Sequence, residues 1–297
     1  MAQTSTRVDL VGDELHWELG CNLAYTISVP AEVVIQVMVA RSANRIVAEH
    51  FSSTVDGHDS RAVSQISAPH GTRMQILHGE VGCLEISYRV EMQSPAPKIA
   101  NAYASVGDAA ESPSEYLSYE RQVYLRPSRY CPSDRLVEFA TLKFGTGADV
   151  AGRIVEITEW IHANTEYLSG SGTVHDSAED TLRIAMGSCR DFAHLGVALS
   201  RATGVPARYV GVYAPQLDPM DFHAVFETFE SGQWCVHDAT ELAPRSAMVR
   251  IATGRDAADV AFISITNGEA NLDSVEIFAH ADPVVPQDGP KVVHVLA

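Results

Sequence analysis

The 297-residue chain carries 21 Lys and Arg against 38 Asp and Glu, a formal net charge of -17, and 46% of its residues are hydrophobic. This negative charge disfavours nucleic acid and acidic substrates, so we expect neutral or basic peptides or proteins as partners. The length allows one large or two ordinary domains, and the apolar fraction predicts a chain that is folded throughout.

The first third of the chain is rich in predicted β-strands. Residues 84–92 alternate apolar and polar side chains with a period of two, which is typical of a half-buried antiparallel strand. Similar segments occur at 22–29, 33–40, 46–51 and 74–78. We expect a β-rich N-terminal sandwich domain over residues 1–100. Pro, Ala, Ser and acidic residues dominate the next stretch, which predicts a connection over residues 101–120.

Helices and then strands are predicted in the second domain, residues 121–297. A helix is expected to start at Ser133-Asp134, and an apolar stripe predicts a better helix over 149–167. The remaining predicted elements are a short helix at 181–186, a helix from Cys189 to Gly204, and strands at 207–214, 222–229, 234–240, 274–279 and 291–296. This order predicts an α+β fold in which the helix after Gly187-Ser188 packs on an antiparallel sheet.

A cysteine, a histidine and an aspartate follow one another along these elements. Cys189 stands in the first turn of its helix, where unpaired amides and the positive end of the helix dipole favour a thiolate. If Phe229 faces Trp234 across a four-residue turn, His223 and Asp238 share one face of the hairpin as diagonal neighbours. A one-residue slip would place them on opposite faces. Because a thiol nucleophile needs a base and the imidazole needs a carboxylate to fix its tautomer, the pattern predicts a catalytic triad.

Other polar and aromatic side chains in this region have plainer explanations. Asp191 is expected to stabilise the helix terminus, His194 to pack or form hydrogen bonds, and Trp234 to be structural. A zinc site built on Cys235 and His237 is disfavoured, because the expected ligand spacing is absent. The sequence also lacks a calcium-binding loop, so no metal or other cofactor is expected.

The segments around these three residues resemble a known family. GSCRDFAHLGVALSRATGVPARYV, FHAVFE and WCVHDAT resemble the catalytic blocks of the transglutaminase-like superfamily, a branch of the papain-like cysteine enzymes. YLRPSRYCPSD and GRDAADV resemble the flanking segments of bacterial members, and the β-rich first domain resembles one that accompanies such cores. The resemblance implies a papain-like core with Cys189 as nucleophile, His223 as general base and acid, and Asp238 as the residue that orients the imidazole. It departs from many relatives at Ala239, where they have proline.

We therefore predict a cysteine peptidase or amidase that works through a thioester intermediate. The alternatives are a transglutaminase, in which an amine takes the acyl group, a non-catalytic peptide-binding module on the same fold, and a zinc-dependent hydrolase. The Cys189 amide is a reasonable first donor of an oxyanion hole, and Tyr167 is a guess for the second. The natural substrate and the oligomeric state are left open.

The compartment is predicted from what the chain lacks. Its start shows no basic stretch followed by an apolar core, and no later apolar run reaches the length of a membrane span. The cysteines are scattered and odd in number, which argues against a disulfide framework (Cys21, Cys83, Cys131, Cys189 and Cys235). We expect a cytoplasmic protein with no membrane partner.

Overall fold

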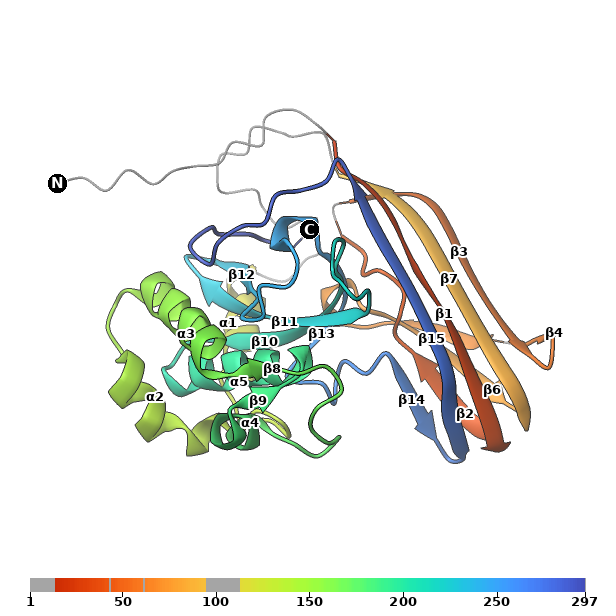
Figure 1. The fold of residues 1–297 in the computed structure, drawn as a ribbon, viewed down its shortest axis with the longest axis horizontal. Helices are drawn as coiled ribbons and strands as arrows, with labels where there is room; N and C mark the ends of the chain where they lie inside the picture. Colours follow the sequence, from red (N-terminus) through yellow and green to blue (C-terminus); the bar gives the residue numbers. More distant parts are fainter. Residues whose placement is uncertain (1–13, 43, 61, 95–112, 297) are drawn as a thin grey trace.

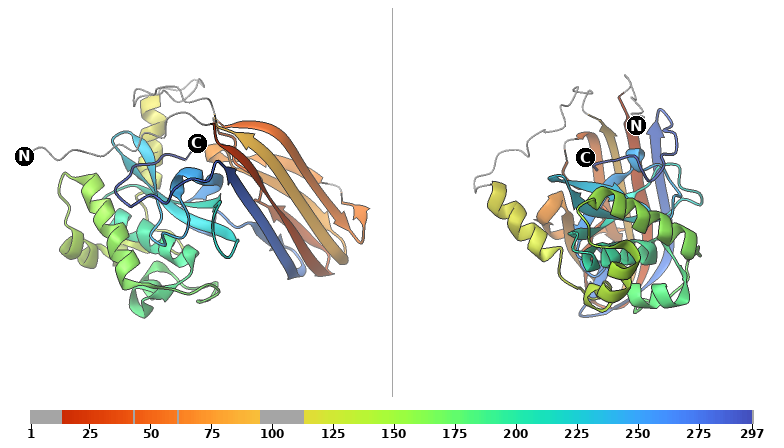
Figure 2. Two further views of the ribbon diagram at one scale, coloured as in Figure 1. Left: turned by 45° about the horizontal axis from the view of Figure 1, so that its top comes forward. Right: turned by 90° about the vertical axis from the view of Figure 1, so that its left-hand side faces the viewer.

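A computed structural model describes residues 14–42, 44–60, 62–94 and 113–296. The chain divides into a two-sheet β unit of long strands and a second unit in which helices cover a third sheet (Figure 1). The helices α2 to α5 lie on the side of that third sheet away from the long strands, and α1 stands apart from them (Figure 2). The predicted α+β fold with an N-terminal β-sandwich is confirmed.

The β unit is built from two antiparallel sheets. One has the order β15-β1-β7-β3-β4 and the other the order β14-β2-β6-β5. The strands are β1 (His16–Val29), β2 (Ala31–Ile35), β3 (Arg45–Val55), β4 (His58–Asp59), β5 (Ala62–Ser67), β6 (Arg73–Gly79), β7 (Gly82–Gln93), β14 (Ile263–Thr266) and β15 (Glu269–Asp282). The alternation predicted for residues 84–92 is confirmed, because Leu84, Ile86 and Tyr88 are buried while Glu85 is exposed. Residues 1–13 of the predicted domain lie outside the described residues.

Two strands from the end of the chain complete these sheets. β15 pairs with β1 over its whole length, and β14 pairs with β2. The predicted boundary, which assigned everything from residue 121 onward to the second domain, is therefore wrong for these strands. The strand predicted at 274–279 is confirmed, but it belongs to the β unit. The period of a strand shows which side chains are buried and not which strand lies beside it, so the sequence could not place them.

The third sheet has the order β12-β11-β10-β13. Its strands are β10 (Ala207–Tyr213), β11 (Phe222–Glu230), β12 (Gln233–His237) and β13 (Val249–Gly254). The helices are α1 (Pro113–Val123), α2 (Val137–Phe144), α3 (Val150–Asn164), α4 (Ala178–Ile184) and α5 (Cys189–Ala202). Short 3-10 turns cover Pro69–Gly71, Ser133–Arg135 and Arg245–Ala247, and β8 (Glu166–Tyr167) forms a small parallel pair with β9 (Met186–Gly187). None of the described helices is long and apolar enough to cross a membrane.

Several predicted elements differ in extent. The predicted connection overlaps α1, whose first residue Pro113 occupies a position where a helix needs no backbone N–H donor; its residues 101–112 lie outside the described ones. The strand predicted at 33–40 ends at Ile35, because the backbone beyond it bonds to the second unit, with Gln36 N donating to Phe262 O and Ala40 N to Arg250 O. Residues 291–296 form no strand and make one backbone bond to the sheet, from Val236 N to His294 O at 2.9 Å.

The helix starts are also adjusted. The start predicted at Ser133 is a 3-10 turn, and α2 follows it at Val137. The helix predicted over 149–167 ends at Asn164, because residues 166 and 167 form β8 instead. Its predicted start is confirmed, since the Asp149 side chain accepts a hydrogen bond from Gly152 N at 2.9 Å. The short helix predicted at 181–186 runs over Ala178–Ile184.

Helix α5 is the centre of the second unit. Nearly all of its residues beyond the first turn are buried, and it packs against β10 and β11. Gly196 permits this close approach, because a Cβ there would lie 2.5 Å from ring carbons of Phe226 on β11. A helix so tightly enclosed holds its first residue, Cys189, in a fixed place relative to the sheet.

The two units form a continuous apolar core and share polar contacts. Trp17 Nε1 donates to Ala247 O at 2.9 Å, and the Tyr213 hydroxyl donates to Val37 O at 2.8 Å. Arg208 of β10 donates to Nδ1 of His70, which belongs to the β unit, at 3.1 Å. These contacts hold the third sheet against the sandwich.

Candidate active site

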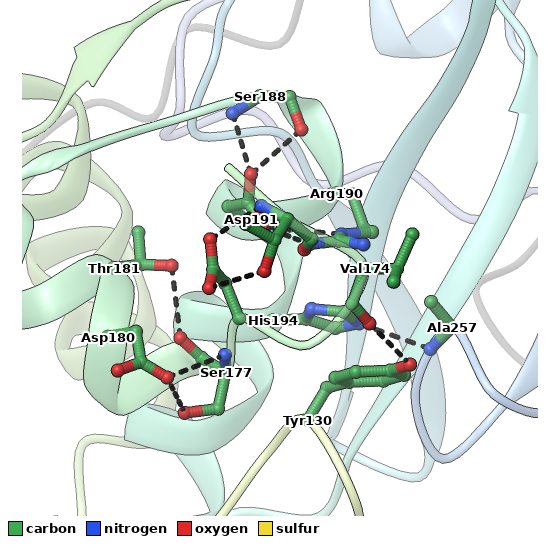
Figure 3. Close-up of polar contacts among 12 residues, drawn as sticks. Tyr130, Val174, Ser177, Asp180, Thr181, Ser188, Arg190, Asp191, His194 and Ala257 are labelled. Atoms are coloured by element: carbon green, nitrogen blue, oxygen red, sulfur yellow. Dashed lines mark hydrogen bonds and ion pairs between the residues drawn. The ribbon is translucent and has the colours of Figure 1, made fainter. Parts of the chain in front are cut away.

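The N-terminus of α5 presents Cys189 with free backbone donors beside it. Asp191 closes the first turn, since its Oδ2 accepts from both the backbone N and the hydroxyl of Ser188 at 2.9 Å (Figure 3). The helix-terminus role predicted for Asp191 is confirmed. The backbone N–H groups of Cys189 and Arg190 lie in the first turn, where no carbonyl of the helix can accept their hydrogen bonds. They therefore remain available to an anion. The Cys189 side chain is half-buried, which leaves it accessible.

Strand β11 of the β11–β12 hairpin carries His223, and Asp238 directly follows the end of β12. Phe229 pairs with Trp234, and the predicted register is confirmed. His223 and Asp238 are almost fully buried, 1% and 5% exposed, and His223 Nε2 lies 2.8 Å from Asp238 Oδ2. The two residues, 15 positions apart in the sequence, therefore form a direct hydrogen bond inside the protein.

The second oxygen of Asp238 is also fully bonded. Its Oδ1 accepts from the backbone N of Thr240 at 2.9 Å and from the Thr240 hydroxyl at 2.7 Å. The carboxylate plane is thereby fixed, and the hydroxyl lies within 3.5 Å of His223 Nε2. Thr240 was not among the predicted site residues, although a hydrogen bond from a backbone N–H to an aspartate two residues earlier is a common local pattern.

Next to this turn, His162 of α3 contacts the backbone at Ala239. Its Nδ1 hydrogen-bonds to the carbonyl of Ala239 at 3.0 Å. This contact ties α3 to the turn that follows Asp238.

The electrostatics of the pair favour a charged imidazole. Burial alone would lower the pKa of the His223 ring, but the charge and hydrogen bond of Asp238 and the adjacent Cys189 thiol raise it to about 10. Burial raises the pKa of the Asp238 carboxyl. The charge and hydrogen bond of the His223 ring and the two Thr240 donors lower it by more, so that the pKa lies below its ordinary value. His223 Nδ1 is buried and has no hydrogen-bond partner among the described residues. With Nε2 held by Asp238, Nδ1 is the nitrogen that remains for the thiol.

Tyr167 lies beside the same helix terminus. It pairs with Gly187 in the parallel β8–β9 bridge, and its ring packs edge-on against Phe192 with centroids 5.8 Å apart. The structure thus places Tyr167 near Cys189, where a second donor of an oxyanion hole would have to lie.

His194 is a structural residue. Its Nε2 accepts from the backbone N of Ala257 at 3.1 Å, and its ring stacks on Tyr130 at 5.1 Å (Figure 3). Burial, with the charges of Arg190 and Arg201, holds its pKa well below the ordinary value, so the ring is neutral. The predicted packing and hydrogen-bonding role is confirmed.

Trp234 and the Cys235–His237 segment have structural surroundings as well. The Arg208 guanidinium lies 4.0 Å from the centroid of the Trp234 ring. His237 Nε2 lies 2.8 Å from Glu230 Oε1, and burial raises the pKa of the Cys235 thiol to about 12. Among the described residues, no group of three His, Cys, Asp or Glu side chains is arranged to hold a metal ion.

Comparison with known proteins agrees with this arrangement. The family model of the transglutaminase-like superfamily matches residues 121–239. The crystal structure of a putative cysteine protease from Cytophaga hutchinsonii is 32% identical, with a TM-score of 0.79 over 92% of this chain and 93% of that one. The chain belongs to the transglutaminase-like superfamily. The predicted family membership is confirmed.

Relatives of this transglutaminase-like protein also occur in mycobacteria. An uncharacterized protein of Mycobacterium leprae is 28% identical over 145 residues, which are 46% of this chain and 52% of that protein. One from Mycobacterium tuberculosis is 28% identical over 176 residues, 53% of this chain and 54% of that protein. The chain thus spans about half the length of these relatives.

Proposed function

We propose that the protein is a thiol-dependent hydrolase that cleaves peptide or amide bonds with Cys189, His223 and Asp238. The observation that carries this proposal is the buried bond from His223 Nε2 to Asp238 Oδ2, which leaves Nδ1 to the thiol. This order of groups supplies a nucleophile, a base and an orienting carboxylate. The similarity to a putative cysteine protease supports the same reaction class.

In the proposed reaction, His223 Nδ1 already holds the proton that comes from the Cys189 thiol, because the raised pKa of the ring favours its charged form. The Cys189 sulfur attacks the substrate carbonyl carbon, a C–S bond forms, and the carbonyl electron pair moves onto oxygen. When the tetrahedral intermediate collapses, the imidazolium gives its proton to the leaving amine and a thioester remains. Asp238 keeps the ring oriented and stabilises its positive charge throughout, since its own pKa is lowered.

Water completes the proposed cycle. His223 accepts a proton from a water molecule as it attacks the thioester, the C–S bond breaks, and the proton returns to sulfur. A primary amine in place of water would give a transglutaminase reaction with the same intermediate. A binding module without catalysis is the third candidate, and the complete His223–Asp238 pair argues against it.

The proposed substrates are neutral or basic peptides. The net charge of -17 repels acidic chains, and the exposed Asp221 stands two residues before His223 at the site. We also propose a cytoplasmic location, which the free thiols of all five cysteines support.

A panel of fluorogenic peptides of different charge, with and without a fluorescent primary amine, tests the proposal. We expect release of the fluorophore by the wild-type protein and none by Cys189→Ala, while Cys83→Ala, which removes an exposed thiol of the β unit, remains active. Equal turnover by Cys189→Ala rejects the nucleophile. Incorporation of the amine without hydrolysis favours a transglutaminase, and peptide binding without turnover favours a binding module.

A further inference from the structure

The position of Tyr167 is set by the β8–β9 bridge. Glu166 N donates to Ala185 O and Leu168 N donates to Gly187 O, both at 2.9 Å, so Tyr167 is held on either side. Its partner in the bridge, Gly187, precedes the nucleophile by only two residues. Neighbouring strands lie about 4.8 Å apart, which places the Tyr167 backbone next to the turn that presents Cys189.

The ring of Tyr167 is directed over the first turn of α5. It packs against Phe192, which follows Cys189 by three residues and therefore lies on the same side of the helix. The side chain is 37% exposed, so it forms part of the surface that a substrate approaching Cys189 would meet. The contact with Phe192 restricts the ring and thereby restricts the hydroxyl.

The hydroxyl itself has no partner among the described residues. Burial and the negative charges of Cys189, Asp221 and Asp238 all oppose its ionisation. Together they raise the pKa of Tyr167 to about 12. The hydroxyl therefore keeps its proton at neutral pH. A protonated, unpartnered hydroxyl beside a nucleophile is suited to donate a hydrogen bond and unsuited to act as a base.

We propose that Tyr167 is a catalytic residue whose hydroxyl donates a hydrogen bond to the substrate oxyanion, together with the backbone N–H of Cys189. The proposal rests on the thiol mechanism described above. When the C–S bond forms, negative charge develops on the former carbonyl oxygen. The helix amide supplies one donor to this oxygen, and Tyr167 supplies a second from β8.

The variant Tyr167→Phe tests this directly, because it removes the donor and retains the ring that packs on Phe192. We expect kcat for a peptide substrate to fall by about 100-fold. A peptide aldehyde provides a second readout: the Cys189 sulfur adds to the aldehyde carbon, the carbonyl electron pair moves onto oxygen, the thiol proton reaches that oxygen by way of His223, and a stable hemithioacetal forms. We expect its affinity to fall by a factor of at least about 10 in the variant.

Alkylation of Cys189 by iodoacetamide is the readout that a merely structural role would change. This displacement generates no oxyanion, so we expect the same alkylation rate in Tyr167→Phe and in the wild-type protein. The matched control is Tyr119→Phe on α1, whose ring is 67% exposed and whose kcat should be unchanged.

The outcomes separate this proposal from the proposed function. A wild-type kcat and aldehyde affinity in Tyr167→Phe overturn the oxyanion role, and so does a parallel loss of alkylation, which would indicate a displaced nucleophile. Weakened aldehyde binding in the variant, with no peptide turnover by the wild-type protein, rejects hydrolysis and retains Tyr167 as the donor. Failure of the wild-type protein to form the aldehyde adduct overturns both.

Discussion

Asp238→Asn isolates the charge that organises the candidate active site. Burial would lower the pKa of the His223 ring, yet Asp238 and Cys189 raise it from 6.5 to about 10. The difference exceeds three pH units, which at about 1.4 kcal/mol per unit corresponds to roughly 4 to 5 kcal/mol in favour of the charged ring. Asp238 is the largest of the influences that raise it, and the amide retains the shape without the charge. We expect the variant to lose most of the imidazolium at neutral pH.

The assay follows carbamidomethylation of individual cysteines at pH 6 by peptide mass spectrometry. An ordinary thiol is only about 0.3% ionised at this pH, whereas a thiol beside a charged imidazole is stabilised as thiolate. Cys83 is exposed and serves as an internal reference in the same sample. We expect Cys189 to react at least about ten times faster than Cys83 in the wild-type protein, and this advantage to disappear in Asp238→Asn.

The matched control is Asp273→Asn, which removes an exposed carboxylate of β15 in the other unit. It should leave the reactivity of Cys189 unchanged. Equal rates for Cys189 and Cys83 in the wild-type protein would refute the activation of Cys189 by the charged His223 ring. An unaltered ratio in Asp238→Asn would show that the carboxylate does not maintain the charged ring.

Three further outcomes are expected. Glu227→Gln leaves two buried guanidinium groups without their carboxylate and should lower the free energy of unfolding by about 3–5 kcal/mol in urea titrations; an unchanged midpoint would contradict this. Asp191→Ala removes the acceptor at the start of α5 and should lower the free energy of unfolding by about 1 kcal/mol in the same titrations. Asp180→Ala removes the equivalent acceptor at the start of α4 and should have a similar effect. The raised pKa of His223 stabilises the fold fully below about pH 6.5, and this contribution is lost as the pH rises through about 10. The stability difference between wild type and His223→Gln should therefore shrink over that interval, and a constant difference would speak against it.

Local patterns in the sequence were sufficient to identify the core of the candidate site. The four-residue turn between Phe229 and Trp234 sets the hairpin register, so the shared face of His223 and Asp238 followed from counting residues. The start of α5 was equally local, because Asp191 bonds to a residue only three positions earlier. Such short-range hydrogen bonds depend on side chains that are adjacent in the sequence.

The remaining features depend on segments that meet only after folding. The return of β15 to β1 joins residues more than 200 positions apart, and the alternation of a strand does not specify its neighbour. The place of Tyr167 beside Cys189 required the β8–β9 bridge, which consists of two residues from each strand and has no periodicity to detect.

The sequence by itself therefore determined the residues of the proposed triad and their local geometry. Only the tertiary structure decided which distant segments surround them, because pairing between distant segments depends on the complementary surfaces of the whole chain.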